Sequence, residues 1–144
     1  MVPLITSFGT IRPWRTLDAD SLTRYANNRN VWISMRDGFP NPYTLEDAKS
    51  FLEIASQQNP VTLCAIATQQ EAIGGIGITI NKDVHRLTAE LGYWLAEPYA
   101  NNEGSFRVLE KAGFTLEGRM RSSVIKEGKI NDQLLYAKIK NTNG

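Results

Sequence analysis

The stretch that decides the fold is "LAEPYANNEGSFRVLEKAGF", residues 95–114. Its second half has the pattern of a short helix, residues 105–112, which Gly113 ends, because glycine readily adopts the left-handed conformation that closes a helix. Its first half ends a predicted strand, residues 87–95, in which apolar and aromatic residues dominate. Only the six residues "AEPYAN" separate this strand from Asn102. The link is too short for a further strand-helix unit, which takes ~30 residues.

Outward from this stretch, strands and helices follow in the order β-α-α-β-β-β-(gap)-α-β-β. The predicted strands are residues 8–14, 61–68, 72–80, 87–95, 115–121 and 132–140. The predicted helices are residues 16–28, 105–112 and one that begins at the cap Thr44 and stops at Asn59-Pro60. In the last of these, Asp47 can bond back to the cap, and one apolar face repeats at i, i+3, i+4 and i+7, formed by Ala48, Phe51, Leu52 and Ala55. Residues 30–43 are expected to be irregular, and turns are expected at residues 69–71 and at Glu127-Gly128. Antiparallel runs of strands with grouped helices indicate an α+β fold.

The bulk composition bounds the function. With 144 residues, 22% charged residues and a net charge of +1, the chain suits one soluble domain with no nucleic-acid partner. No apolar run reaches the ~20 residues of a membrane span, and no signal peptide is recognised, so a cytoplasmic location is expected. The single Cys64 and single His85 offer no cluster of metal ligands, and Cys64 is expected in the core.

Three segments carry a resemblance to a known family: "IRPWRTLDADSL", "TAELGYWLAEPY" and, most specifically, "NNEGSFRVLEKAGFTLEGRMR". They resemble the GNAT family of acetyl-CoA-dependent N-acetyltransferases, in particular its branch of ribosomal-protein N-acetyltransferases. The resemblance implies the acyl-CoA N-acyltransferase fold, a mixed, mostly antiparallel sheet with helices on both faces. It also implies acetyl-CoA as co-substrate and an amine as acceptor.

One family feature is missing from the sequence. After the fourth strand, the family has a glycine-rich turn whose following helix binds the cofactor's pyrophosphate, and then a further strand. A helix N-terminus suits an anion because its N–H groups are unpaired. The turn, the helix and the strand do not fit between Leu95 and Asn102. A single domain spanning residues 1–144 is therefore expected, with an internal deletion near 96–101. The loss is either real or an artefact of the sequence record. The glycines of "GGIGI" at 74–78 lie in a strand and do not replace the turn.

Glu90 is the candidate general base for removing a proton from the acceptor amine. It shares one strand face with Gly92 and Trp94 in an apolar strand, so we expect burial and hence a raised pKa. The resemblance gives a glutamate at a similar place this role. The alternative is a strand-edge carboxylate paired with a nearby Lys or Arg.

The resemblance also implies residues for the cofactor. Backbone N–H groups near Leu95 and Ala96, at a bulge in the strand, would hold the acetyl carbonyl and the pantetheine arm. Asn102 would hydrogen-bond the pantetheine arm, and Ser105 would lie near the sulfur as a catalytic residue. Both residues are equally suited to capping the helix that follows.

Basic residues of that helix are further candidates. Arg107 could reach a cofactor phosphate, whereas Lys111 is better explained by the helix dipole. Leu109 stands where many family members have a tyrosine acid, so protonation of the leaving thiolate falls to Ser105, to water or to nothing.

The acceptor side rests on the irregular segment between the first two helices. The resemblance implies that this segment lines the acceptor groove, and we assign substrate binding to Arg29, Trp32 and Tyr93. Arg36, Phe39 and Tyr43 lie in the same segment or at its end, and the aromatic residues could equally cover the core.

The expected activity is direct transfer of an acetyl group from acetyl-CoA to a primary amine, either a protein N-terminus or a small amine. The alternative is an inactive, internally deleted remnant that acts at most as an interaction module. A homodimer is a third expectation, because removing an inner strand exposes unpaired sheet edges.

Overall fold

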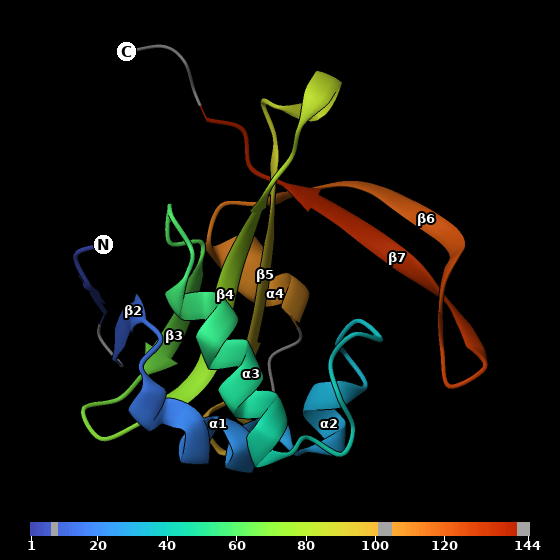
Figure 1. The fold of residues 1–144 in the computed structure, drawn as a ribbon. Coiled ribbons are helices and arrows are strands. Elements are labelled where there is room, and N and C mark those ends of the chain that lie inside the picture. Colours follow the sequence, from blue (N-terminus) through green and yellow to red (C-terminus); the bar gives the residue numbers. More distant parts are fainter. Residues whose placement is uncertain (7–8, 101–104, 141–144) are drawn as a thin grey trace. The chain divides into compact units, whose positions relative to one another are not determined.

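The computed structural model describes residues 1–6, 9–100 and 105–140, which form two compact units, Met1–Ala100 and Asn101–Gly144 (Figure 1). The strands of the first unit are β1 Leu4–Ile5, β2 Thr10–Pro13, β3 Leu63–Ala67, β4 Ala72–Ile80 and β5 Ala89–Leu95. Its α-helices are α1 Ala19–Ala26, α2 Arg29–Trp32 and α3 Leu45–Ser56. Its 3-10 turns are η1 Thr16–Asp18, η2 Asp83–His85 and η3 Glu97–Tyr99. The second unit holds α4 Ser105–Lys111, β6 Thr115–Lys126 and β7 Lys129–Ala137. The single-domain organisation expected from the sequence stays a prediction.

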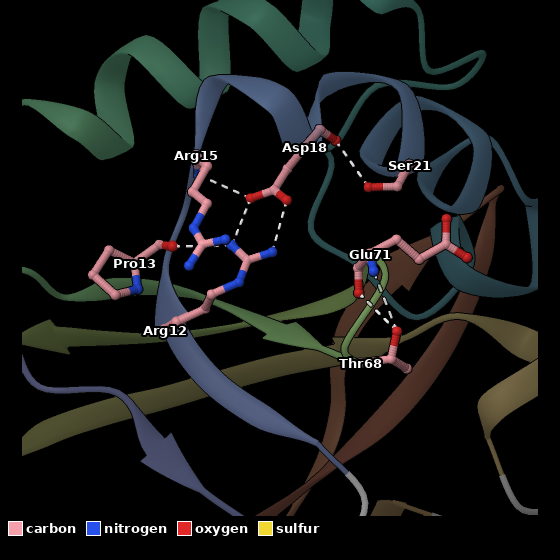
Figure 2. Close-up of polar contacts among 7 residues, drawn as sticks. All are labelled: Arg12, Pro13, Arg15, Asp18, Ser21, Thr68 and Glu71. Atoms are coloured by element: carbon pink, nitrogen blue, oxygen red, sulfur yellow. Dashed lines mark hydrogen bonds and ion pairs between the residues drawn. The ribbon is translucent and has the colours of Figure 1, made fainter.

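The strands of the first unit form one sheet in the order β1-β2-β3-β4-β5, with every neighbouring pair antiparallel. This arrangement confirms the predicted antiparallel α+β fold. Strands β3 and β4 form the predicted hairpin, and Thr68 closes its turn by donating its backbone N–H to the Glu71 carbonyl at 2.9 Å. The Thr68 hydroxyl also accepts the Glu71 N–H at 3.2 Å (Figure 2). Among the described residues, no strand pairs with the outer side of β5. The strand that carries Glu90 is therefore an edge strand.

Helices α1 and α3 contact each other and bury their apolar stripes over the sheet (Figure 1). The predicted stripe of α3 is confirmed, since Ala48, Leu52 and Ala55 are buried and Phe51 packs against the core. Trp14, Leu22, Ala26, Tyr43, Ala65 and Ala72 complete the core cluster. Small residues dominate this core, and close approach of the helices to the strands follows from their size.

A buried ion pair joins β2 to the first helical segment (Figure 2). The Arg12 guanidinium donates two parallel hydrogen bonds of 2.8 Å to the carboxylate of Asp18, and the two residues are 8% and 5% exposed. Asp18 also accepts the backbone N–H of Arg15 at 2.8 Å, and Ser21 donates to its carbonyl at 3.0 Å. These bonds fix where β2 ends and the helix begins, because one carboxylate satisfies donors from both sides of the junction.

The N-terminus of α3 has the predicted cap. Thr44 accepts the backbone N–H of Asp47 at 3.2 Å, and the Asp47 carboxylate accepts the backbone N–H of Thr44 at 2.8 Å. The side-chain hydroxyl of Thr44, and then its backbone N–H, lower the pKa of Asp47 by hydrogen-bonding to the charged form. The stabilisation from this carboxylate is therefore present above the ordinary Asp pKa and is lost as the pH falls through the lowered value.

We predict that Thr44→Ala lowers the free energy of unfolding of the first unit by about 1 kcal/mol at pH 7, because the lost hydroxyl no longer accepts the Asp47 N–H or donates to the Asp47 carboxylate. The loss should shrink in acid, where protonated Asp47 no longer contributes. Urea unfolding at pH 7 and pH 3, followed by tryptophan fluorescence, measures both. The fluorescence reports this unit because Trp14, Trp32 and Trp94 all lie within it. An unchanged urea midpoint at pH 7 would contradict the prediction.

The second unit consists of α4 followed by a two-stranded antiparallel sheet. Gly113 ends α4 with a positive φ of 82°, and the Phe114 N–H donates to the Leu109 carbonyl at 2.9 Å, as expected of a helix closed by glycine. Glu127 and Gly128, with φ of 50° and 73°, form the predicted turn of the β6–β7 hairpin. Both strands reach closer to this turn than predicted: β6 ends at Lys126 and not at residue 121, and β7 begins at Lys129 and not at residue 132.

Two expectations about the first helical region are wrong in part. The predicted helix 16–28 is a 3-10 turn, η1, followed by α1. The segment 30–43 is not wholly irregular, because it includes most of α2. The Asn28 side chain caps α2 by accepting the backbone N–H groups of Asn30 at 2.7 Å and Val31 at 3.3 Å. A four-residue helix shows too little periodicity to be recognised in a sequence.

Candidate active site

Strands β4 and β5 together form the floor of the candidate site. Their cross-strand pairs include Gly75 with Trp94, Gly77 with Gly92, and Thr79 with Glu90. Residues two apart share a face of a strand, so these three pairs lie on one face in succession. The middle pair carries no side chains. The floor is therefore flat between Trp94 at one end and Glu90 at the other.

A cavity of about 750 Å³ lies on this floor. The segment after α2 and helix α3 supply its walls, and they include Met35, Arg36, Phe39, Tyr43, Ser50 and Phe51. A volume of this size is typical of small-molecule sites, which span roughly 300–1,000 Å³. The cavity lies wholly within the first unit, so the residues that line it are positioned by one sheet and its covering helices.

Aromatic rings dominate one end of the cavity. The Phe39 ring lies 6.1 Å from that of Trp94 and 5.1 Å from that of Tyr43, centroid to centroid. At the base of the wall, Trp14 and Phe51 make an edge contact at 5.5 Å. Burial, and then the charge of Asp47, raise the pKa of Tyr43 to about 12. Tyr43 is therefore a neutral phenol at physiological pH, and this end of the cavity is mainly aromatic, with the carboxylate of Asp47 nearby.

Glu90 marks the other end of the cavity and is paired with Arg36. The guanidinium of Arg36 donates to the Glu90 carboxylate at 2.8 Å, and the two side chains are 90% and 58% exposed. The expected burial of Glu90 is wrong, because β5 is an edge strand and the carboxylate lies at the mouth of the cavity. The alternative of an edge carboxylate paired with an arginine describes the observed contact, and the assignment of Glu90 as base stays a prediction.

The end of β5 differs from the expectation for the oxyanion donors. The Ala96 N–H donates to the Ile73 carbonyl at 2.8 Å, so this amide is not free. The register from Ile80 with Ala89 to Gly74 with Leu95 runs without a shift, so the expected bulge in this strand is absent. Because antiparallel residues alternate in direction, Leu95 turns its N–H and C=O to the outer side of β5. Of the two predicted donors, only Leu95 is directed to the open edge.

The chain after β5 folds back onto the helices. In η3, Glu97 accepts hydrogen bonds from the side chains of Asn28 at 2.7 Å and Asn30 at 2.8 Å. These two bonds, that from Asn28 first, lower the pKa of Glu97. The Tyr99 ring makes an edge contact with Tyr25 at 5.9 Å. Residues 97–99 thus form a 3-10 turn that is anchored to the helical segments. The internal deletion expected near 96–101 stays a prediction.

The predicted acceptor residues are only partly brought together. Tyr93 lines the cavity, whereas Arg29 and Trp32 lie on α2, where the Arg29 guanidinium contacts the Trp32 ring at 5.9 Å, and neither lines the cavity. Arg36, Phe39 and Tyr43 from the same segment do line it. Gly77, Gly92 and Trp94 were not assigned to the acceptor site from the sequence. The alternation Glu-x-Gly-x-Trp leaves a position without a side chain between two functional groups. The structure shows that this position is open at Gly92, whereas the Leu63 side chain lies over its partner Gly77.

The remaining predicted cofactor residues belong to the second unit. Asn102 lies outside the described residues, and so does the side chain of Ser105, the first residue of α4. Arg107 is exposed on α4, one turn before Lys111. Their roles stay predictions. In the described part of the chain, no group of three or more His, Cys, Asp or Glu residues could hold a metal ion. His85 is exposed in η2, and Cys64 is buried with a free thiol. None of the described helices is both long and apolar enough to cross a bilayer.

Comparison with known protein families identifies the class. The acetyltransferase (GNAT) domain matches residues 10–101, which is more than half of the chain. The chain therefore belongs to the GNAT acetyltransferase family, a family of acyltransferases. No curated protein matches the sequence.

Solved structures show the same fold. The ribosomal-protein-S5-alanine acetyltransferase from Vibrio fischeri is 17% identical with a TM-score of 0.77, over 99% of this chain and 98% of that chain. RimL, a ribosomal L7/L12 α-N-protein acetyltransferase in complex with coenzyme A, is 17% identical with a TM-score of 0.76, over 94% and 96%. MccE, the microcin C7 self-immunity acetyltransferase in complex with acetyl-CoA and AMP, is 21% identical with a TM-score of 0.74, over 94% of each chain. Two of these three are ribosomal-protein acetyltransferases, the branch that the sequence resembles.

Proposed function

We propose that this chain is an N-acetyltransferase that transfers an acetyl group from acetyl-CoA to a primary amine. The observation that carries the proposal is the cavity of about 750 Å³ with the Glu90 carboxylate at its mouth, on the strand whose outer edge is open. Bound acetyl-CoA supplies a thioester that a neutral amine attacks. The acceptor amine must lose a proton for this attack, and a carboxylate at the mouth is placed to take it directly or through one water.

Arg36 does not prevent Glu90 from taking this role. An ion pair between two exposed side chains contributes only ~0–1 kcal/mol, because water screens both charges and holding two long side chains costs entropy. An ammonium group entering the cavity can therefore replace the Arg36 guanidinium on the carboxylate at little cost. Glu90 then binds the protonated amine first and accepts its proton afterwards.

The open edge of β5 fits one part of the co-substrate. A pantetheine arm carries two amides, and an extended chain of amides pairs with a strand edge through backbone hydrogen bonds. We assign this contact to Leu95, whose N–H and C=O are directed outward. The arm then takes the Leu95 C=O as its acceptor, and the Leu95 N–H is left as the candidate donor for the developing oxyanion. The Ala96 N–H is excluded from this role because it is bonded to Ile73.

The described residues of the first unit do not fit the diphosphate of the co-substrate. After β5 they form only η3, which contains Pro98 and no glycine-rich turn. Candidates for the phosphates and for the arm are Arg107, Asn102 and Ser105 of the second unit, as the family resemblance implies. Ser105 is also the candidate proton donor to the leaving thiolate.

The anchored η3 turn supports a second candidate function. If no part of the chain replaces the missing donors, the protein is an acetyltransferase by descent that no longer binds acetyl-CoA and acts at most through partner contacts. The open edge of β5 then offers a surface for association, including association with a second copy, because unpaired strand edges pair readily.

Calorimetric titration of the folded chain with acetyl-CoA separates the two functions. We predict binding with a Kd in the micromolar range, and Arg107→Ala should weaken it by about tenfold, since one charged phosphate contact contributes ~1.5 kcal/mol. If desulfo-CoA binds with a Kd similar to that of acetyl-CoA, the nucleotide and the pantetheine arm provide most of the binding free energy. Absence of heat with a chain that shows cooperative unfolding would contradict the proposed function and support the inactive remnant.

A further inference from the structure

The acceptor cavity has one charged end and one flat apolar end. Three ionisable side chains of opposite sign line it, the carboxylates of Asp47 and Glu90 and the guanidinium of Arg36. Asp47 is committed to the cap of α3, where it accepts from Thr44. Glu90 is therefore the one carboxylate of the lining that an incoming cation can share. The lining carries two negative charges against one positive charge, which favours a cationic ligand.

The space next to Glu90 is shaped by the glycine pair of the floor. A side chain placed on Gly92 would meet no atom within 4 Å, so this position opens into the cavity. A side chain on Gly75 would collide with the indole of Trp94 at 2.8 Å, so Gly75 is needed for Trp94 to lie against the strand. The two glycines thus make one continuous flat surface from the Trp94 ring to the open space above Gly92.

The spacing of the two ends sets the length of the ligand. Gly92 lies two residues from Glu90 and two from Trp94, and residues two apart on a strand are roughly 7 Å apart. An ammonium group on the Glu90 carboxylate then places a planar group two or three bonds away over Gly92, with its edge toward the rings of Trp94 and Phe39. Aromatic groups in such edge or offset contacts gain about 0.5–1.5 kcal/mol beyond area burial.

We propose that the acceptor is a small primary amine that carries a flat aromatic or apolar body on a short linker. This inference rests on the proposed function for the identity of the site, and it names the substrate class. A protein N-terminus fits the cavity less well. An extended peptide needs backbone partners, and the face of a sheet offers none, because the N–H and C=O groups of a strand point sideways within the sheet. The middle of this floor, at Gly77 and Gly92, also lacks polar side chains.

The test is equilibrium binding without acetyl-CoA, so that its outcome does not depend on catalysis. The probe is 2-phenylethylamine, compared with ethylamine, which lacks the ring, and 2-phenylethanol, which lacks the charge. Binding is followed by calorimetry and by tryptophan fluorescence, since Trp14 and Trp94 line the cavity. We expect 2-phenylethylamine to bind at least tenfold more tightly than either comparison compound. A tetrapeptide with a free N-terminal alanine is expected to bind at least tenfold more weakly than 2-phenylethylamine.

The variants Gly92→Ala and Gly92→Val fill the open space in two steps. Both should fold, because nothing lies within 4 Å of a Cβ added at Gly92 and β-branched residues suit strands. The affinity for 2-phenylethylamine should fall in that order, by at least tenfold for valine. Gly118→Val is the matched control, since Gly118 also lies in a strand with nothing within 4 Å, but in the second unit. Unchanged affinity in Gly92→Val, or equal affinity for ethylamine, would overturn the proposal.

The two proposals fail separately in this design. If the protein binds 2-phenylethylamine as expected but transfers no acetyl group, the inference about the cavity stands and the proposed activity is contradicted. If the protein acetylates ethylamine or the peptide at least as well as 2-phenylethylamine, the proposed activity stands and the inference about the acceptor class is contradicted.

Discussion

Glu90→Gln should lower kcat for acetylation of a primary amine by about 10²–10⁴-fold, the usual contribution of a positioned general base. The expected loss of kcat comes from the proton-transfer step and not from weaker binding of acetyl-CoA. An amine is protonated at pH 7 and cannot attack a carbonyl until it loses that proton, and a glutamine amide cannot accept it. The Kd for acetyl-CoA should stay within twofold, because the Glu90 side chain lies on the acceptor side of the sheet, at the mouth of the cavity. Steady-state kinetics with 2-phenylethylamine and calorimetry with acetyl-CoA measure the two quantities.

Arg36→Gln is the matched control for Glu90→Gln. It removes the other half of the same ion pair and leaves the carboxylate in place. We expect kcat to be retained and KM for the amine to fall, since the amine no longer competes with the guanidinium. If Arg36→Gln and Glu90→Gln lowered kcat equally, the ion pair itself would be the important feature and Glu90 would not be the base. Unchanged kcat in Glu90→Gln would remove Glu90 from the mechanism outright.

The strands and helices that carry strong local signals could be predicted from the sequence. Strand β4 was predicted at residues 72–80 and lies there, and the cap of α3 at Thr44 was predicted with its partner Asp47. The turn at Glu127-Gly128 was also found where it was predicted. These features depend on neighbours within a few residues, so the sequence alone contains their physical cause.

The features of the site depend on contacts between distant residues and could not be predicted in the same way. Alternation placed Glu90, Gly92 and Trp94 on one face, and the register confirms it. The alternation did not show that β5 is an edge strand of its sheet. The expected burial of Glu90 required a further strand beside β5. The bond from Ala96 to Ile73 joins residues 23 positions apart and removes an amide that the family resemblance had left free. The open position at Gly92, next to a Gly77 that the Leu63 side chain covers, likewise appears only when the strands are paired.

Asp18→Ala should lower the free energy of unfolding of the first unit by about 3–5 kcal/mol, because it leaves the buried Arg12 guanidinium without its partner. Arg12 is 8% exposed, so water cannot replace the two hydrogen bonds that the carboxylate accepts (Figure 2). The backbone N–H of Arg15 also loses its acceptor. Asp20→Ala is the matched control, an exposed acid two residues along the same helical segment, and its loss should stay below ~1 kcal/mol. Urea unfolding followed by tryptophan fluorescence measures both variants.

The double variant Arg12→Met, Asp18→Leu separates the cost of an orphaned charge from the contribution of the pair itself. Burying two charges costs several kcal/mol of solvation free energy, and the attraction between the charges does little more than offset this cost. Two apolar residues of similar volume therefore often restore most of the stability. We therefore expect the double variant to be at least 2 kcal/mol more stable than Asp18→Ala. If the double variant were as unstable as Asp18→Ala, the bond from the Arg15 N–H to the Asp18 carboxylate, which both variants lose, would be what holds β2 to the helix. A loss below ~1 kcal/mol in Asp18→Ala, which is typical of an exposed pair, would show that Arg12 reaches water in solution.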